Sequence, residues 1–123
     1  MTNPIQDLKP YIDGWRRRAA RAEAAKSERQ NRALALARRC AAILADDFGA
    51  ERVFLIGSLA EGCFRLDSDI DLVAEGVSPR DYFTALSKIS TAAGDFDVDL
   101  ILWESYKYQD EVLEKGVILY ESP

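Results

Sequence analysis

Acidic residues alternate along a short stretch that follows a turn of small residues, in the segment IGSLAEGCFRLDSDIDLV, residues 56–73. Side chains two residues apart on a β-strand point to the same face, so Asp69 and Asp71 should share one face. Ile70 and Leu72 then point to the opposite face, towards the core. Adjacent carboxylates repel one another and are tolerated mainly where a cation binds among them, and hard oxygen ligands favour Mg²⁺ or Mn²⁺. The segment therefore predicts a metal site.

Two further acids lie in a second apolar segment, Phe96 to Trp103, which predicts another strand. Asp97 and Asp99 alternate with apolar residues and share one face of it. If this strand pairs with the one that carries Asp69 and Asp71, a third carboxylate joins the first two. Three acids suit a pair of metal ions about 4 Å apart, which stabilise the attacking and leaving oxygens of a phosphoryl transfer. Either Asp97 or Asp99 could be the third ligand, and we predict Asp99.

A turn of small residues, Gly57-Ser58, ends the strand that precedes the acids. Glycine lets a phosphate approach the backbone, and the serine amide and hydroxyl can face an anion while the serine caps a short helix. A P-loop interpretation of this turn fails, because lysine and a hydroxyl residue do not follow Gly62. A calcium loop starting at Asp67 fails as well, because its glycine and its closing glutamate are missing. The turn and the acids together predict a bound nucleoside triphosphate with Mg²⁺.

The rest of the sequence supplies the elements that must position these residues. Asp13 to Phe48 has no proline and is rich in alanine, arginine, leucine and glutamate, which predicts one long helix or two consecutive helices. Its second half carries an apolar stripe that should face the core: Ala33, Leu36, Ala37, Cys40, Ile43, Leu44 and Phe48. Strands are predicted at 52–56, 69–74, 96–103 and 117–120, and shorter helices at 79–93 and 104–115. The buried face of the first of these helices should be Phe83, Leu86 and Ile89. The fold class is therefore α+β, or mixed α/β, with one sheet and helices against it.

Length and composition narrow the function further. The chain has 123 residues, of which 48% are hydrophobic and none is histidine. We expect a single domain, 1–123, made of a basic helical segment (1–50) and a core (51–123). The lack of histidine excludes Cys/His zinc fingers and Ser/His/Asp triads, and Cys40 and Cys63 should be reduced and buried. The first ten residues lack the apolar centre of a signal peptide, and no apolar run could span a membrane, so a cytoplasmic protein is expected.

The net charge of −5 is unevenly distributed. Residues 1–50 carry ten basic and six acidic side chains, whereas residues 51–123 carry six basic and fifteen acidic ones, so the two parts have net charges of +4 and −9. Between residues 16 and 32 nothing apolar is larger than alanine. A basic helix could bind nucleic acid, but Glu23 and Glu28 interrupt the run, so contact with a partner protein is favoured.

The acids and the small-residue turn together resemble the signature of the minimal nucleotidyltransferase domains of the DNA polymerase beta superfamily. In that signature a Gly-Ser pair, here Gly57-Ser58, is followed after ten residues by Asp-x-Asp, here Asp69 and Asp71. Further matching positions are Gly62, Asp67-Ser68, Asp99 and the closing segment 114–120. The resemblance covers about residues 51–121. It implies a polymerase-beta-like fold, a small mixed sheet with helices on one side, preceded by the long N-terminal helix or helix pair.

The resemblance implies catalytic roles for three acids. Asp69 and Asp71 would bind the metals, two Mg²⁺ ions with Mn²⁺ as a substitute. Asp99 would be the third metal-binding carboxylate and would help to activate the acceptor hydroxyl.

The resemblance also implies a nucleotide site for ATP. Gly57 and Ser58 would hold the triphosphate. Many family members have an arginine directly after the Gly-Ser pair, where this chain has Leu59. A cation near the phosphates must therefore come from Arg65 or be absent.

Chains of this minimal kind resemble the antitoxins of two-gene pairs whose other member is a helical HEPN ribonuclease toxin. In those pairs the transferase moves AMP from ATP onto a tyrosine of the toxin. The resemblance thus implies a Mg²⁺-dependent protein adenylyltransferase that contacts a HEPN-type toxin through its N-terminal helix. Two alternatives stay open: a catalytically weak antitoxin that sequesters its partner, and nucleotidyl transfer to an RNA end.

Overall fold

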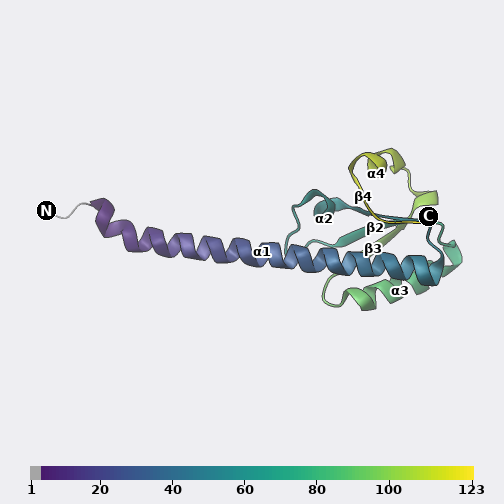
Figure 1. The fold of residues 1–123 in the computed structure, drawn as a ribbon, viewed down its shortest axis with the longest axis horizontal. Coiled ribbons are helices and arrows are strands. Elements are labelled where there is room, and N and C mark those ends of the chain that lie inside the picture. Colours follow the sequence, from purple (N-terminus) through teal and green to yellow (C-terminus); the bar gives the residue numbers. More distant parts are fainter. Residues whose placement is uncertain (1–3) are drawn as a thin grey trace.

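The computed structural model describes residues 4–123, with side chains from residue 8 onward. Figure 1 shows how its helices and strands are arranged. Residues 1–3, which belong to the first ten residues in which we expect no signal peptide, lie outside the described residues. The elements, in chain order, are α1 (Pro4–Phe48), β1 (Arg52–Ile56), α2 (Gly57–Glu61), β2 (Ile70–Glu75), α3 (Tyr82–Ala93), β3 (Val98–Leu102), α4 (Gln109–Lys115) and β4 (Val117–Glu121). Short 3₁₀ turns at Pro79–Asp81 and Trp103–Ser105 precede α3 and follow β3. The predicted α+β fold class is confirmed.

The four strands form one mixed sheet in the order β3-β2-β1-β4. β1 pairs antiparallel with both β2 and β4, whereas β2 and β3 run parallel. The two strands that carry the acids are therefore neighbours, as the sequence requires for a shared carboxylate site. The crossover between them contains α3, as expected for a connection between parallel strands.

The two faces of the sheet are covered differently (Figure 1). One face packs against α1 and α3 and contains most of the buried apolar side chains, including Leu55, Leu72 and Leu100. The opposite face carries a smaller cluster of Phe54, Val73 and Val112, the last of which comes from α4. The two long helices thus lie on one side as predicted, while α4 covers only part of the other side.

α1 is one continuous helix that begins at Pro4, earlier than the predicted start at Asp13, and it contains Pro10. Proline lacks an N–H donor and usually marks a helix boundary, so the sequence prediction placed the start after it. Only the second half of α1 packs in the core, where Ala33, Ala37, Cys40, Ala41 and Leu44 are buried. Burial raises the pKa of the Cys40 thiol to about 11. No helix within residues 4–123 combines the length and apolarity needed to cross a membrane.

Three local predictions were wrong. Phe83 was expected in the core but is 81% exposed, because the buried face of α3 is Ala85, Ile89 and Ala93. Each step of three residues turns a helix by about 60°, so Phe83 lies about 120° away from Ile89. The 3₁₀ turn at Trp103–Ser105 ends β3 early and delays the next helix until Gln109. Cys63 is free, as expected, but exposed.

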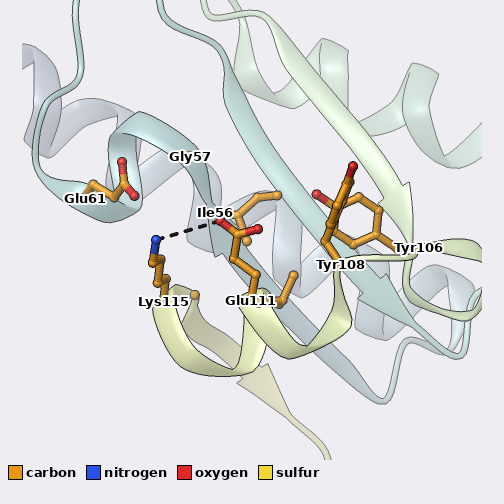
Figure 2. Close-up of a pocket in the computed structure, with 9 residues that line it drawn as sticks. Ile56, Gly57, Glu61, Tyr106, Tyr108, Glu111 and Lys115 are labelled. Atoms are coloured by element: carbon orange, nitrogen blue, oxygen red, sulfur yellow. Dashed lines mark ion pairs between the residues drawn. The ribbon is translucent and has the colours of Figure 1, made fainter.

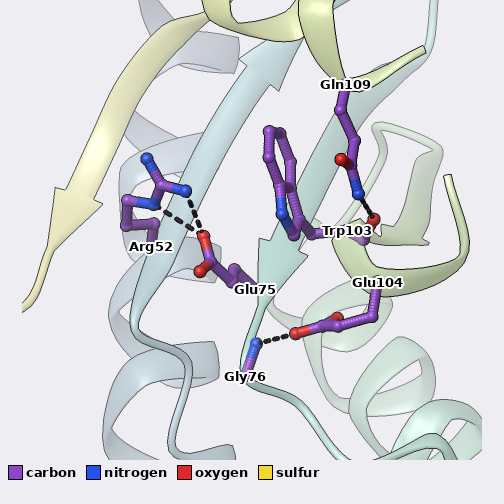
Figure 3. A network of polar contacts seen from close by, with 6 residues as sticks. All are labelled: Arg52, Glu75, Gly76, Trp103, Glu104 and Gln109. Atoms are coloured by element: carbon purple, nitrogen blue, oxygen red, sulfur yellow. Dashed lines mark hydrogen bonds and ion pairs between the residues drawn. The ribbon is translucent and has the colours of Figure 1, made fainter. Parts of the chain in front are cut away.

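Polar contacts connect the start of β1 with the residues that follow β2 and β3 (Figure 3). Arg52 donates from Nε to Glu75 Oε2 at 2.6 Å, and its guanidinium lies 5.3 Å from the centre of the Trp103 ring. Gly76 N donates to Glu104 Oε1 at 2.6 Å, and Gln109 Nε2 to the Trp103 carbonyl at 2.7 Å. Side-chain contacts thus stabilise this end of the sheet. The Gly-Ser turn lies at the opposite end of the strands.

Replacing a buried leucine of α1 tests which half of the helix stabilises the fold. Leu44 is fully buried, so Leu44→Ala should lower the free energy of unfolding by about 2–5 kcal/mol in urea denaturation. Leu8→Ala is the matched control on the same helix, because Leu8 is 54% exposed, and it should change the value by less than about 0.5 kcal/mol. Similar losses from both variants would contradict this division of α1.

Candidate nucleotidyl-transfer site

The sheet register brings the acids and the glycine turn to one edge. Asp71 on β2 is paired with Ile56, the last residue of β1, and with Asp99 on β3. Residues directly opposite one another in a sheet share a face. The carboxylates of Asp71 and Asp99 therefore lie on the α4 side of the sheet, and Gly57 follows immediately at the end of β1.

Gly57 and Asp71 approach each other closely. Gly57 has a φ of +77°, a conformation that side chains other than glycine rarely adopt. A Cβ placed on Gly57 would also collide with the Asp71 carboxylate oxygen Oδ2. The position thus needs glycine for two reasons, and the acid lies directly against the backbone of the turn.

The turn continues into the short helix α2. Ser58 is partly buried in the first turn of α2 rather than at its N-cap, which is Ile56 and makes no side-chain cap, so the expected capping role of Ser58 is wrong. Leu59 is buried in the core, which explains why no cation stands at this position. Gly62 ends α2 with a φ of +78°, and Cys63 N donates to the Ser58 carbonyl at 2.9 Å.

The acids influence one another electrostatically. Burial, followed by the negative charges of Asp99 and Asp69, raises the pKa of Asp71 to about 6. Asp69 itself is exposed and lies just before β2. The ordering of these effects identifies Asp99 as the carboxylate that acts most strongly on Asp71.

Asp97 occupies a different position from Asp99. It lies just before β3 with an exposed side chain, and its backbone carbonyl accepts a hydrogen bond from Ile70 N at 2.8 Å. It does not contribute to the shifted pKa of Asp71. These observations favour Asp99 over Asp97 as the third carboxylate.

A cavity of about 220 Å³ opens beside Gly57 on the α4 side of the sheet (Figure 2). Its lining includes Tyr106 and Tyr108, whose rings meet edge to face at 5.4 Å. Glu61 from α2 and Glu111 and Lys115 from α4 add charged groups. Lys115 Nζ lies 3.8 Å from Glu111 Oε1.

Sequence reasoning gave a role to Gly57 but none to the other residues that line this cavity. The closing segment 114–120 includes Lys115, yet nothing in its sequence pattern shows that α4 turns back towards Gly57. Tyr106 and Tyr108 follow the 3₁₀ turn that the sequence did not predict. The only feature of the sequence that could have indicated this cavity is the pair Tyr106 and Tyr108, which closely follows the predicted strand 96–103.

Arg65 lies on the other side of this edge. It is exposed in the turn before β2, where its N–H donates to Ser68 Oγ at 2.9 Å. Its surroundings include Lys26 and Arg29 of α1, with which it lines a hollow separate from the cavity beside Gly57. Contact of Arg65 with a nucleotide stays a prediction.

Comparison with protein families identifies this fold. Residues 38–123, more than half of the chain, match the model described as polymerase beta, nucleotidyltransferase. The chain belongs to the polymerase beta nucleotidyltransferase family. The match leaves out residues 1–37, which include most of α1. A search among curated protein sequences found no match.

Several solved structures are similar in fold to this chain. A toxin–antitoxin with AMP-PNP is 23% identical, over 76% of this chain and 73% of that chain, with a TM-score of 0.56. A mutant of the toxin–antitoxin MntA-HpeT is 20% identical over the same shares, with a TM-score of 0.55. A nucleotidyltransferase candidate from Sulfolobus solfataricus is 23% identical over 78% of this chain and 86% of that chain, with a TM-score of 0.51. These likenesses confirm the polymerase-beta-like fold.

The family implies divalent metal ions, and the acids suit them chemically. Asp69, Asp71 and Asp99 supply oxygen donors whose mutual repulsion a cation would relieve. Within residues 4–123 no group of three or more acidic or cysteine side chains is already arranged to hold an ion alone. Mg²⁺ is commonly bound through one or two carboxylates together with water and substrate phosphates, so this open arrangement fits it.

Adding a methyl group at Gly57 tests its contact with Asp71. Gly57→Ala should lower the free energy of unfolding by about 2–3 kcal/mol, because the new Cβ adds backbone strain and displaces the Asp71 carboxylate. Gly62→Ala is the matched control with the same positive φ but open space around it, and it should cost about 1 kcal/mol. In an Asp71→Ala background the two substitutions should cost equal amounts, as a double-mutant cycle measures. An unchanged excess cost at Gly57 in that background would contradict the contact.

The raised pKa of Asp71 predicts a pH dependence of stability. Between pH 4 and pH 6 the folded protein holds this proton while the unfolded chain releases it, so the free energy of unfolding should fall as the pH rises. Asp71→Asn should remove much of this slope and stabilise the metal-free protein at pH 7. Urea denaturation with EDTA at several pH values measures the effect. Asp67→Asn, on the exposed loop, is the control that should keep the wild-type slope.

Proposed function

We propose that this nucleotidyltransferase moves AMP from ATP to a tyrosine hydroxyl of a partner protein, with Mg²⁺, and that it acts as the antitoxin of a HEPN-type ribonuclease toxin. The observation that carries the proposal is the register that pairs Asp71 with both Asp99 and the end of β1, beside the glycine turn. Similar folds in toxin–antitoxin complexes, one of them with AMP-PNP, support the partner and the nucleotide.

The reaction forms one bond and breaks one. The acceptor oxygen attacks the α-phosphorus of ATP, the bond to the bridging oxygen of the β-phosphate breaks, and pyrophosphate leaves. Asp99 would accept the hydroxyl proton or orient that hydroxyl, since it is paired with Asp71 at the site edge. Bound Mg²⁺ would supply charge neutralisation for the phosphates, held by Asp69, Asp71 and Asp99.

The turn would position the phosphates. Gly57 presents backbone without a side chain, and Ser58 supplies an amide and a hydroxyl in the first turn of α2. Lys115 lines the cavity next to Gly57 and is the cation there, in place of the arginine that Leu59 replaces. Arg65 would reach the nucleotide only from the α1 side of the edge.

Loss of the paired acids should abolish the transfer. With ATP labelled on the α-phosphate, Mg²⁺ and the protein encoded by the adjacent gene, Asp69→Asn with Asp71→Asn should lose on the order of 10²- to 10⁴-fold in the rate of covalent labelling. Phosphorimaging of the partner on a denaturing gel measures it. Asp99→Asn should show a comparable loss, and Asp97→Asn is its matched control, expected to keep most of the rate. Undiminished labelling by the double variant would overturn the proposed function.

A second candidate is a binding antitoxin that neutralises its partner by covering it. The buried Leu59, in a position where many family members carry arginine, favours this alternative. Such a protein would form a stable complex in the same experiment and leave no covalent label. Transfer to an RNA end is a third possibility, for which labelled RNA in place of the protein acceptor gives the test.

A further inference from the structure

The first half of α1 projects from the body of the protein (Figure 1). We call residues 8–28 the arm. Every residue from Trp15 to Glu28 is exposed. The arm nevertheless carries large apolar side chains near its tip, with Trp15 66% exposed and Tyr11 75% exposed. It lies outside the part of the chain that matches the family model, so the family fold does not require it.

One side of the arm points in the direction of the sheet. Residues eighteen positions apart on an α-helix are separated by about five full turns and face nearly the same way. The residues of α1 buried in the core, between the sheet and α3, are Ala33, Ala37, Cys40 and Leu44, with Ala41 at the border of this side. Eighteen positions earlier stand Trp15, Ala19, Ala22 and Lys26, with Glu23 at the border of this side, in the place that corresponds to Ala41. These four residues form what we call the docking face.

The arm leaves the body beside the candidate site. At its root, Arg29 donates from Nη2 to the carbonyl of Leu66, which belongs to the loop that leads to Asp69, at 2.8 Å. Gln30 of α1 also lies near the end of α2, since a Cβ placed on Gly62 would be 4.0 Å from the Gln30 Nε2 atom. A molecule held on the docking face would therefore extend in front of the sheet edge that carries Gly57 and the acids.

The docking face suits an acidic helix. Ala19 and Ala22 leave room for close approach of another helix, and the Trp15 ring is an exposed anchor. Lys26 and Arg29 line a hollow with Ala22, and within residues 8–123 neither forms an ion pair. Helical geometry puts two acids of the arm, Asp13 and Glu28, on its opposite side, and the third, Glu23, at the border of the docking face. The docking face is thus apolar and positively charged, while the core from residue 51 onward is acidic.

We infer that the docking face binds an acidic amphipathic α-helix of the protein that accepts the nucleotide, and so presents the acceptor hydroxyl to the site edge. This inference rests on the proposed function for the identity of the acceptor. The binding itself needs no nucleotide and no catalysis. Docking and transfer can therefore be tested apart.

The test measures fluorescence anisotropy of a synthetic helical peptide with a leucine stripe flanked by glutamates, titrated with the full chain. Binding with a Kd on the order of 10 μM is expected, and the same peptide with lysines in place of the glutamates should not bind. Trp15→Ala and Lys26→Glu should each weaken binding by about tenfold or more. Arg17→Glu is the matched charge control, because Arg17 lies on the opposite side of the arm, and it should change the Kd by less than about threefold.

The outcomes separate this inference from its alternatives. Asp69→Asn with Asp71→Asn should bind the peptide as the wild type does, so failure of transfer alone leaves the docking inference standing. Absence of peptide binding, or equal losses from Lys26→Glu and Arg17→Glu, would overturn it. Salt-sensitive binding of single-stranded RNA in place of the peptide would do the same, as would light-scattering evidence of a dimer that Trp15→Ala dissociates.

Discussion

A side chain at position 57 would displace the carboxylate of Asp71, and much of the structure serves to maintain that close approach. Asp71 reaches Gly57 because β2 pairs with β1 over the full length of β1, from Arg52 to Ile56. The pairing is held in place by Leu55 and Leu72, which are buried against α1 and α3 on the other face of the sheet. Packing on one face thus fixes an acid against a backbone turn on the other.

The two parts of the chain carry charges of opposite sign. The acids lie together at the ends of neighbouring strands, where burial, followed by repulsion from Asp99 and Asp69, raises the pKa of Asp71. Cations would stabilise this edge, and with them it would meet the phosphates of a nucleotide at lower electrostatic cost. The basic residues are carried instead by the first half of α1. The separation of charge seen in the sequence is therefore a separation in space between α1 and the edge of the sheet that carries the acids.

Sequence patterns predicted the elements whose periodicity is local and failed where tertiary contacts decide. The alternation around Ile70 and Leu72 correctly gave the strand and its buried face, and the pairing with the strand of Asp99, on which the third carboxylate depended, is present. Phe83 was misplaced because several apolar residues of α3 compete for the core, and packing against α1 selects Ala85 and Ile89. The length of α1 was underestimated because Pro10 normally ends a helix.

For the candidate site, too, the sequence indicated the residues on strands but not those that depend on tertiary contacts. The register needed to bring Asp71, Asp99 and Gly57 together follows from the positions of these residues in strands. The cavity residues Tyr106, Tyr108 and Lys115 could not be found, because they approach Gly57 only through the path of the chain after β3. That path includes a 3₁₀ turn with no clear sequence signal.

Because α1 is one continuous helix, the direction in which the arm faces depends on the number of residues between the arm and the core. One residue added between the arm and the core would turn the arm by about 100° and move its tip by about 1.5 Å. Insertions of about seven, eleven or eighteen residues would restore its direction to within about 20° while lengthening it. The arm is therefore a spacer whose length can change in steps, and each step would suit a partner of a different size.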